Sequence, residues 1–268
     1  MTAPLIMGVV NATPDSFSDG GRFPTEAAAV SHALRLVEQG AAVLDIGGES
    51  TRPGAQPVEE AEEIARVVPI VARLARDTTA PLSVDTMKPA VARAAVVAGA
   101  AIWNDVTALT GAPDSADVAA GLGCRVVLMH MRGEPRTMQQ APAYDDVVGE
   151  VEAYLLARAE AAMAAGVARD RILIDPGIGF GKRAEHSLAL LAALPRLCAH
   201  GWPVVLGCSR KRFIQAVDPT AKDPLDRLGG SLAAALAGAN AGVAMVRVHD
   251  VRETAQALAV WSAVEAAR

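Results

Sequence analysis

An alternation between short apolar runs and longer segments of helical period, repeated eight times, constrains this chain more than any other feature. Strands so short and so nearly continuous in apolar character are typical of a parallel sheet covered by helices. The predicted strands are Leu5–Val10, Val43–Ile46, Leu82–Val84, Ala101–Trp103, Arg125–Met129, Ile172–Ile174, Val204–Leu206 and Ala244–Val248. The clearest predicted helices are Thr25–Gln39, Val58–Arg76, Tyr144–Ala165 and Glu185–Cys198.

Eight such repeats in 268 residues match the usual size of a (β/α)8 TIM barrel. A doubly wound open sheet has the same local pattern and is the alternative. No stretch rich in proline, glycine and serine and no block of charge divides the chain. We therefore expect an α/β protein with a single barrel domain over residues 1–268.

The composition limits the cellular compartment and the binding partners that we expect for this protein. The net charge of −5 gives no reason to expect nucleic acid as a partner. Cys124, Cys198 and Cys208 form no C-x-x-C pair, which argues against a disulfide scaffold or zinc site and fits a reducing compartment. The start MTAPLIMGVV lacks the basic region of a signal peptide, and the apolar stretch Leu232–Val246 is too short to span a membrane. These features predict a cytoplasmic protein without membrane contact.

Polar residues stand at the carboxyl end of every predicted strand. One such residue is most simply a helix cap, but helix capping explains eight in a row poorly. In a closed barrel these ends meet at one mouth, where barrel enzymes bind their substrates. In strand order they are Asn11, Gly47-Gly48-Glu49, Asp85, Asn104-Asp105, His130, Asp175, Ser209-Arg210-Lys211-Arg212, and Arg247 with His249 and Asp250.

The residue types at these ends indicate two kinds of ligand group. Carboxylates and amides, at Asp85, Asn104 and Asp175, suit the donors and acceptors of an amino-pyrimidine edge. Cations after the second strand and the last two strands suit phosphate: Arg52, Lys211, Arg212, Arg247 and His249. Arg212 is equally well explained as a surface residue. Arg247 lies within an apolar strand and requires an anionic partner.

The loop DPGIGFGKR, residues 175–183, has the appearance of a phosphate-binding loop. Pro176 stands where a P-loop needs its first glycine, and Arg183 where it needs serine or threonine. Lys182 replaces the third glycine of the dinucleotide fingerprint. The glycines here and in GGESTRPG (47–54) allow close approach of the backbone to some other ligand.

Eight segments together resemble the dihydropteroate synthases, the folate-pathway enzymes that sulfonamide drugs inhibit. They are MGVVNATPDSFSDGG (7–21), DIGGESTRPGA (45–55), SVDTMKP (83–89), WNDV (103–106), LMHMRGEPRTMQ (128–139), DPGIGFGK (175–182), CSRK (208–211) and RVHDV (247–251). The resemblance covers nearly the whole chain in order. It implies a transferase that joins 6-hydroxymethyl-7,8-dihydropterin diphosphate to 4-aminobenzoate and releases pyrophosphate and 7,8-dihydropteroate.

The resemblance also implies roles for individual residues. The pterin slot would be lined by Asp85, Asn104, Asp175 and Lys211. Mg²⁺ would be the cofactor and Asn11 its ligand, with Asn11, Arg247 and His249 holding the diphosphate. Aminobenzoate would lie beside Phe17, Thr51, Arg52, Pro53, Phe180 and Ser209. Relatives of this kind are commonly homodimers, and the alanine-rich segment Leu225–Ala241 fits either a dimer contact or packing on the barrel.

Two residues depart from the pattern of the dihydropteroate synthase family. Arg212 stands where many relatives have serine, and Ile178 where phenylalanine is common.

Three alternative functions share features with this sequence. A methyltetrahydrofolate methyltransferase barrel would have a similar pterin slot but needs neither diphosphate cations nor the GGESTRPG loop. A silent paralogue that binds pterin without turnover is compatible with the same residues. An aldolase barrel would need a lysine within a strand, whereas Lys88 and Lys182 fall in loops or helix starts.

Overall fold

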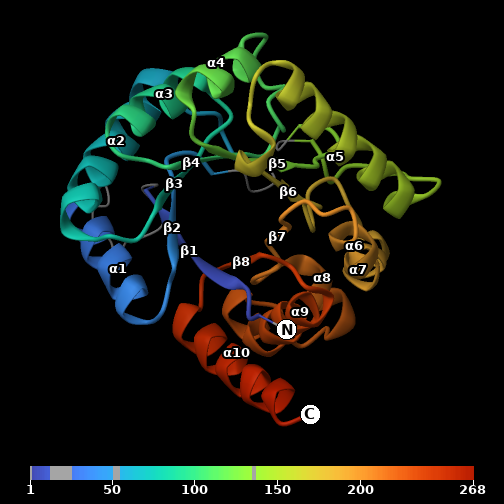
Figure 1. Ribbon diagram of the computed structural model, residues 1–268. Helices are drawn as coiled ribbons and strands as arrows, with labels where there is room; N and C mark the ends of the chain where they lie inside the picture. Colours follow the sequence, from blue (N-terminus) through green and yellow to red (C-terminus); the bar gives the residue numbers. More distant parts are fainter. Residues whose placement is uncertain (1, 13–25, 51–54, 135–136) are drawn as a thin grey trace.

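The computed structural model describes residues 2–12, 26–50, 55–134 and 137–268. Eight parallel strands form one sheet in the order β6-β5-β4-β3-β2-β1-β8-β7. A parallel bridge between Ile174 and Val204 joins the two outer strands, so the sheet closes on itself as a ring (Figure 1). The strands are β1 (Leu5–Asn11), β2 (Val43–Gly47), β3 (Leu82–Asp85), β4 (Ile102–Asp105), β5 (Arg125–Met129), β6 (Ile172–Asp175), β7 (Val205–Leu206) and β8 (Met245–Val248). The fold is a (β/α)8 TIM barrel, which confirms the predicted class and excludes the open sheet.

Helices cover the outside of the ring and separate successive strands (Figure 1). They are α1 (Glu26–Glu38), α2 (Glu60–Asp77), α3 (Pro89–Val97), α4 (Ser115–Leu122), α5 (Val147–Ala164), α6 (Ala184–Ala192), α7 (Leu194–Cys198), α8 (Arg212–Val217), α9 (Leu228–Ala241) and α10 (Val251–Ala266). Short 3-10 turns, η2 (Arg169–Arg171) and η3 (Pro224–Arg227), precede β6 and α9. None of the helices in the described part of the chain is long and apolar enough to cross a membrane.

The period of two along each strand divides the apolar residues into two separate cores. Outward-facing residues such as Leu44, Val84 and Trp103 pack under the helices in one continuous cluster. Inward-facing residues form a second cluster that fills the barrel. This inner cluster consists of Met7, Val43, Ile102, Val127, Leu173, Val205 and Met245. The barrel interior is therefore a packed apolar plug, and ligands can reach only its ends.

Several predicted boundaries differ from the structure. Four strands continue through the polar residue that was expected to follow them, such as Asp85 on β3 and Asp175 on β6. Their last polar side chains are therefore fixed by strand pairing rather than carried on loops. The predicted helix Glu185–Cys198 is two helices, because Pro195 lacks the N–H that a continuous helix would use there. The expected helix start at Thr25 lies outside the described residues.

Candidate active site

A layer of polar side chains lies above the apolar plug, at the carboxyl ends of the strands. Strand register sets its members: Gly47 pairs with Asp85 between β2 and β3, and Asp85 pairs with Asn104 between β3 and β4. Asp175 and Arg247 lie on either side of Gly207, since a Cβ at Gly207 would be 3.7 Å from Asp175 Oδ2 and 4.0 Å from Arg247 Cβ. Asp85 and Arg247, which are 162 positions apart in the sequence, thus share one mouth.

Arg247 has the anionic partners that its position in β8 required. Its Nη2 donates to Asp85 Oδ2 at 2.8 Å, and its Nε donates to Asp45 Oδ2 at 2.6 Å. Burial by itself would lower the pKa of Arg247, but the charges of Asp45 and Asp85 more than reverse this and the pKa is raised. The arginine is a fixed positive charge at the centre of the mouth.

Asp45 is the member of this site that the sequence reasoning missed. It lies within β2 rather than at its end, is fully buried, and also accepts from Asn104 Nδ2 at 3.1 Å. A charge inside an apolar strand needs a partner, and this holds for Asp45, between Leu44 and Ile46, as much as for Arg247. That signal was present in the sequence.

Asp175 is buried at the end of β6, and its Oδ1 accepts from Gly177 N–H at 2.7 Å. Burial raises the pKa of its carboxyl to about 6, against the lowering effects of Gly177 N–H and Lys211. Burial likewise raises the pKa of Asp85, opposed by the charge of Arg247. Both carboxylates are costly to keep ionised without a ligand, as is common at functional sites.

Lys211 faces the same layer from the loop after β7. Burial lowers its pKa to about 8, the charge of Arg247 adds to this, and the charge of Asp175 opposes it. Its ammonium also lies 4.0 Å from the centre of the Phe180 ring, a cation–π distance. This contact ties the loop after β6 to the loop after β7.

Lys182, whose position in the Gly-Lys pair prompted the comparison with a P-loop, points into the protein and is 3% exposed. Its Nζ donates to three carbonyl oxygens, of Gly177 at 3.0 Å, Phe180 at 3.0 Å and His130 at 3.2 Å. It also lies 2.8 Å from His130 Nδ1. Burial, and then the charge of Lys182, lowers the pKa of His130 to about 3, so the imidazole is neutral and its Nδ1 can share one of the three ammonium hydrogens with a carbonyl oxygen. Lys182 therefore holds the 175–183 loop in shape from within.

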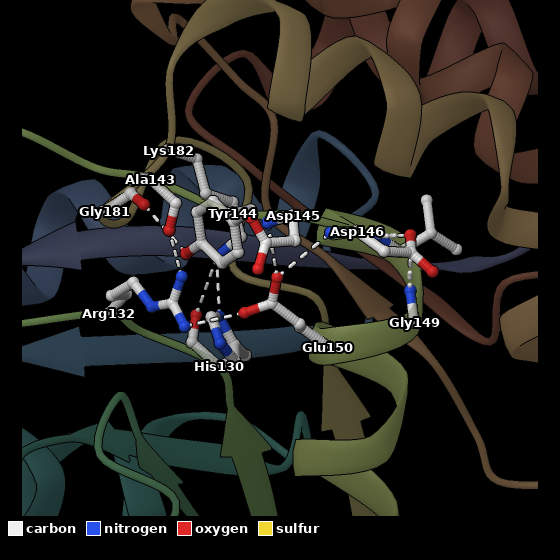
Figure 2. Close-up of polar contacts among 11 residues, drawn as sticks. His130, Arg132, Ala143, Tyr144, Asp145, Asp146, Gly149, Glu150, Gly181 and Lys182 are labelled. Atoms are coloured by element: carbon white, nitrogen blue, oxygen red, sulfur yellow. Dashed lines mark hydrogen bonds and ion pairs between the residues drawn. The ribbon is translucent and has the colours of Figure 1, made fainter.

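The loop after β5 completes this support, and Figure 2 shows its side chains gathered around His130 and Lys182. Tyr144 Oη donates to Gly181 O at 2.8 Å, and the Arg132 guanidinium lies 4.1 Å from the centre of the Tyr144 ring. Arg132 also pairs with Glu150 at 2.7 Å in the first turn of α5. His130 directly follows β5, as predicted, but it serves this network and not the polar layer.

Gly177 and Gly181 have φ of 65° and 60°, the left-handed region that disfavours other residues. A Cβ at Gly177 would lie 1.9 Å from His130 O, and one at Gly181 would lie 2.2 Å from Arg132 O. These glycines admit the neighbouring backbone of the β5 loop. The sequence analysis predicted that the backbone of this loop approaches a ligand closely. Part of that close approach is to the protein's own β5 loop.

Ser209 and His249 are in contact at the end of β7 and β8. His249 Nδ1 lies 3.0 Å from Ser209 Oγ, which also accepts from His249 N–H at 3.3 Å. Burial, followed by the charge of Arg247, lowers the pKa of His249 to about 3. His249 is thus a neutral hydrogen-bonding group in this structure, whereas the sequence reasoning counted it among the cations. Ser209, expected near aminobenzoate, lies on the His249 side.

The remaining predicted residues are distributed as follows. Asn11 ends β1 opposite Gly47, at the mouth. Arg212 begins α8 and is exposed, which favours the surface explanation. Phe17, Thr51, Arg52 and Pro53 lie outside the described residues. His186 is only 7% exposed, because it caps α6 by accepting from Arg183 N–H and packs edge-on against Tyr144.

The GGES segment, residues 47–50, is anchored by its own set of contacts. Lys88 pairs with Glu49 and with Glu63, which is fully buried on α2. Arg66 Nη1 donates to Gly48 O at 2.8 Å. A Cβ at Gly48 would come within 2.6 Å of Val67, so glycine is required there for close packing on α2. The GGES segment is thus fixed at the edge of the mouth.

Comparison with known proteins agrees with this geometry. A protein family described as "Pterin binding enzyme" matches residues 7–249. The dihydropteroate synthase of Escherichia coli K12 is 44% identical over 268 residues, which cover 100% of this chain and 94% of that protein. The structure of Xanthomonas albilineans dihydropteroate synthase with 4-aminobenzoic acid is 54% identical, with a TM-score of 0.92 over 98% of this chain and 94% of that one. The same enzyme in complex with 7,8-dihydropteroate aligns at 50% identity and a TM-score of 0.88, over 98% and 94% of the two chains.

Proposed function

This chain belongs to the dihydropteroate synthase family of pterin-binding enzymes, and we propose that the polar layer at its barrel mouth carries out the reaction of that family. It condenses 6-hydroxymethyl-7,8-dihydropterin diphosphate with 4-aminobenzoate and releases pyrophosphate and 7,8-dihydropteroate. One observation carries the assignment of this reaction to the mouth: buried carboxylates, an amide and cations from separate strands meet there above a sealed apolar plug.

The pterin is the ligand that Asp85, Asn104, Asp175 and Lys211 are suited to hold. Asp175 has one oxygen on Gly177 N–H and can accept from the ring N–H and amino group in addition. Lys211 would face the ring carbonyl. Each hydrogen bond to a charged group contributes roughly 1.5–3 kcal/mol, so a ring lacking these donors would leave a buried carboxylate unpaired and be rejected.

The diphosphate would lie over β1 and β8, held by Asn11, Arg247 and His249. Arg247 supplies the fixed positive charge. His249, neutral here, would contribute a hydrogen bond, and the approach of a polyanion would favour its protonation. Ser209 would set the orientation of that imidazole through its contact at 3.0 Å.

Aminobenzoate would bind on the side of the mouth where Phe180 packs on Lys211. In the sequence, Thr51, Arg52 and Pro53 follow the anchored GGES segment and Phe17 follows β1, and the described ends of both elements are at the mouth. The Lys88 pairs with Glu49 and Glu63 hold the described GGES segment that leads to this side.

Mg²⁺ fits this site as a shared ligand of substrate and protein. Among the described residues there is no group of three histidine, cysteine, aspartate or glutamate side chains that could cage a metal. Mg²⁺ commonly uses few protein oxygens and completes its shell with phosphate and water, and the amide oxygen of Asn11 is one such ligand. When bound, it would neutralise charge that develops on the leaving diphosphate.

The reaction we propose is a dissociative substitution. The bond between the pterin methylene carbon and the diphosphate oxygen breaks, and the electron-rich dihydropterin ring shares the positive charge left on that carbon. The neutral amine of aminobenzoate then attacks the carbon and loses a proton. A weakly basic aniline needs no strong base, so orientation and the preorganised charges of Arg247 and Lys211 would supply most of the rate.

Pyrophosphate release tests the function directly. Purified protein would be mixed with the pterin diphosphate, 4-aminobenzoate and Mg²⁺, and 7,8-dihydropteroate identified by mass. Release that depends on aminobenzoate is expected. Pterin binding by calorimetry without any turnover would instead favour a silent paralogue, and methyl transfer from methyltetrahydrofolate to a corrinoid would favour the methyltransferase alternative.

We further propose a cytoplasmic homodimer. The three cysteines are free, which agrees with a reducing compartment. Large apolar side chains are exposed on α8, η3 and α10, at Val217, Leu225, Val260 and Val264. Within the predicted segment Leu225–Ala241, the small residues of α9 pack on the barrel, since a Cβ at Gly238 would be 2.6 Å from Leu206. Light scattering that gives the mass of one chain would contradict the dimer.

A further inference from the structure

Asp45 is buried one step below the mouth, on the inward face of β2. It pairs in register with Val9 on β1 and with Ser83 on β3, while the residue two places further along, Gly47, pairs with Asp85 at the mouth. Asp45 therefore lies beneath the residues that would contact substrate. No ligand that rests on Asp85 and Arg247 needs to reach it.

One oxygen of Asp45 makes both of its hydrogen bonds. Oδ2 accepts from Arg247 Nε at 2.6 Å and from Asn104 Nδ2 at 3.1 Å. The two donors belong to β8 and β4, on opposite sides of β2 in the sheet order. A single atom thus sets the position of one group proposed for the diphosphate and one proposed for the pterin.

From this convergence we infer that Asp45 is a positioning residue that orients Arg247 and Asn104 together for substrate. The inference rests on the proposed function. Because a carboxylate can only accept, Asp45 forces Asn104 to turn its NH₂ downward and leaves its Oδ1 as the atom that can accept from a ligand. It also holds Nε of Arg247 so that Nη2 reaches Asp85.

A contribution to folding stability explains the buried carboxylate of Asp45 less well than orientation of the two substrate-binding groups does. The second oxygen, Oδ1, is buried and has no hydrogen-bond partner, and the same is true of Ser83 Oγ beside it in the register. A buried charge pair is often no better for folding than apolar side chains of similar size, and an unsatisfied buried oxygen calls for a functional explanation. Orientation of the two substrate-binding groups is such an explanation.

The test is Asp45→Asn beside Ser83→Ala, a control at the same depth of the barrel. Calorimetry would measure the dissociation constant of 6-hydroxymethylpterin and, separately, that of inorganic pyrophosphate with Mg²⁺. For Asp45→Asn we expect each to bind about 10- to 100-fold more weakly, the effect of losing a hydrogen bond to a charged group. The KM for aminobenzoate should stay within about twofold, because neither Phe180 nor Ser209, the two residues of that side that the structure describes, hydrogen-bonds to Asp45. Ser83→Ala should change none of the three constants.

Two outcomes would overturn the inference. One is an Asp45→Asn variant with a lowered melting temperature and unchanged affinity for both ligands, which would make the residue merely structural. The other is a wild-type crystal structure with bound pyrophosphate in which Arg247 or Asn104 has left Asp45, and this measurement serves even if the variant fails to fold. A wild-type protein that binds neither ligand would refute the proposed function instead.

Discussion

Replacing Lys182 with methionine would remove the buried ammonium and keep an apolar side chain of similar length. The structure shows three carbonyl oxygens on this ammonium, at 3.0 to 3.2 Å. Gly177 O would keep the Phe180 N–H as a donor. Each buried carbonyl left unsatisfied costs about 1–3 kcal/mol, partly offset because a buried charge is no longer required. We expect Lys182→Met to lower the free energy of unfolding by about 2–4 kcal/mol at pH 7.

The pH dependence of this loss is the more specific prediction. Burial lowers the pKa of Lys182 from 10.5 to about 7 in the folded protein, against the charge of Asp175. Between these values the unfolded chain binds a proton that the folded chain does not, so raising the pH favours folding. The free energy of unfolding of the wild type should therefore rise relative to the variant by up to about 1.4 kcal/mol per pH unit in this window.

Urea unfolding at pH 7, 8 and 9 would measure both quantities for the wild type, Lys182→Met and Lys222→Met. Lys222 is exposed and controls for the general loss of a positive charge. The difference in the free energy of unfolding between the wild type and Lys182→Met should grow with pH. The corresponding difference for Lys222→Met should stay constant. A Lys182 difference that is constant over this range would refute the idea that the ammonium is desolvated beneath the loop.

Three further predictions concern the same loop. Asp175→Asn should weaken pterin binding by about 100-fold, because one acceptor of the pair becomes a donor, and near-parental affinity in calorimetry would contradict the assignment. In the wild type, the raised pKa of Asp175, about 6, means that pterin affinity should fall as the pH drops below this value, and the free energy of unfolding of the wild type relative to Asp175→Asn should be larger at pH 5 than at pH 7.5. Gly177→Ala should cost more than about 3 kcal/mol in thermal unfolding because of the 1.9 Å approach to His130 O, whereas Gly201→Ala, with a similar φ of 73° and open space, should cost only about 1–2 kcal/mol. Equal losses for the two glycine variants would show that φ alone, and not the close approach, requires glycine at position 177.

The fold could be predicted because its signal is local and repeated. Eight apolar runs separated by helical segments, each run with a polar residue at its carboxyl end, are the sequence pattern of a parallel barrel. Asp85, Asn104 and Asp175 could be chosen from the same pattern, since residues at the carboxyl ends of barrel strands necessarily share one mouth. Boundaries were less accurate, because the sheet pairing that extends β3 and β6 through their aspartates involves residues distant in sequence.

The internal contacts of the site could not be predicted in the same way. The sequence showed that Arg247 needs an anion, but Asp45 is 202 residues away, and only the closure of the barrel places β8 two strands from β2. The sequence also could not distinguish a lysine that binds ligand from one that binds its own loop. Lys182 and Lys211 both follow glycine- or serine-rich loops, and tertiary packing turned the first inward onto three carbonyls and the second toward the mouth.

By itself, then, the sequence determined the architecture and the set of groups available at one end of the barrel, because periodicity and strand ends are properties of neighbouring residues. Only the tertiary structure decided which of those groups pair with each other and which are left for substrate. Hydrogen bonds and charge pairs form over about 3 Å, and which side chains come that close depends on how distant segments pack.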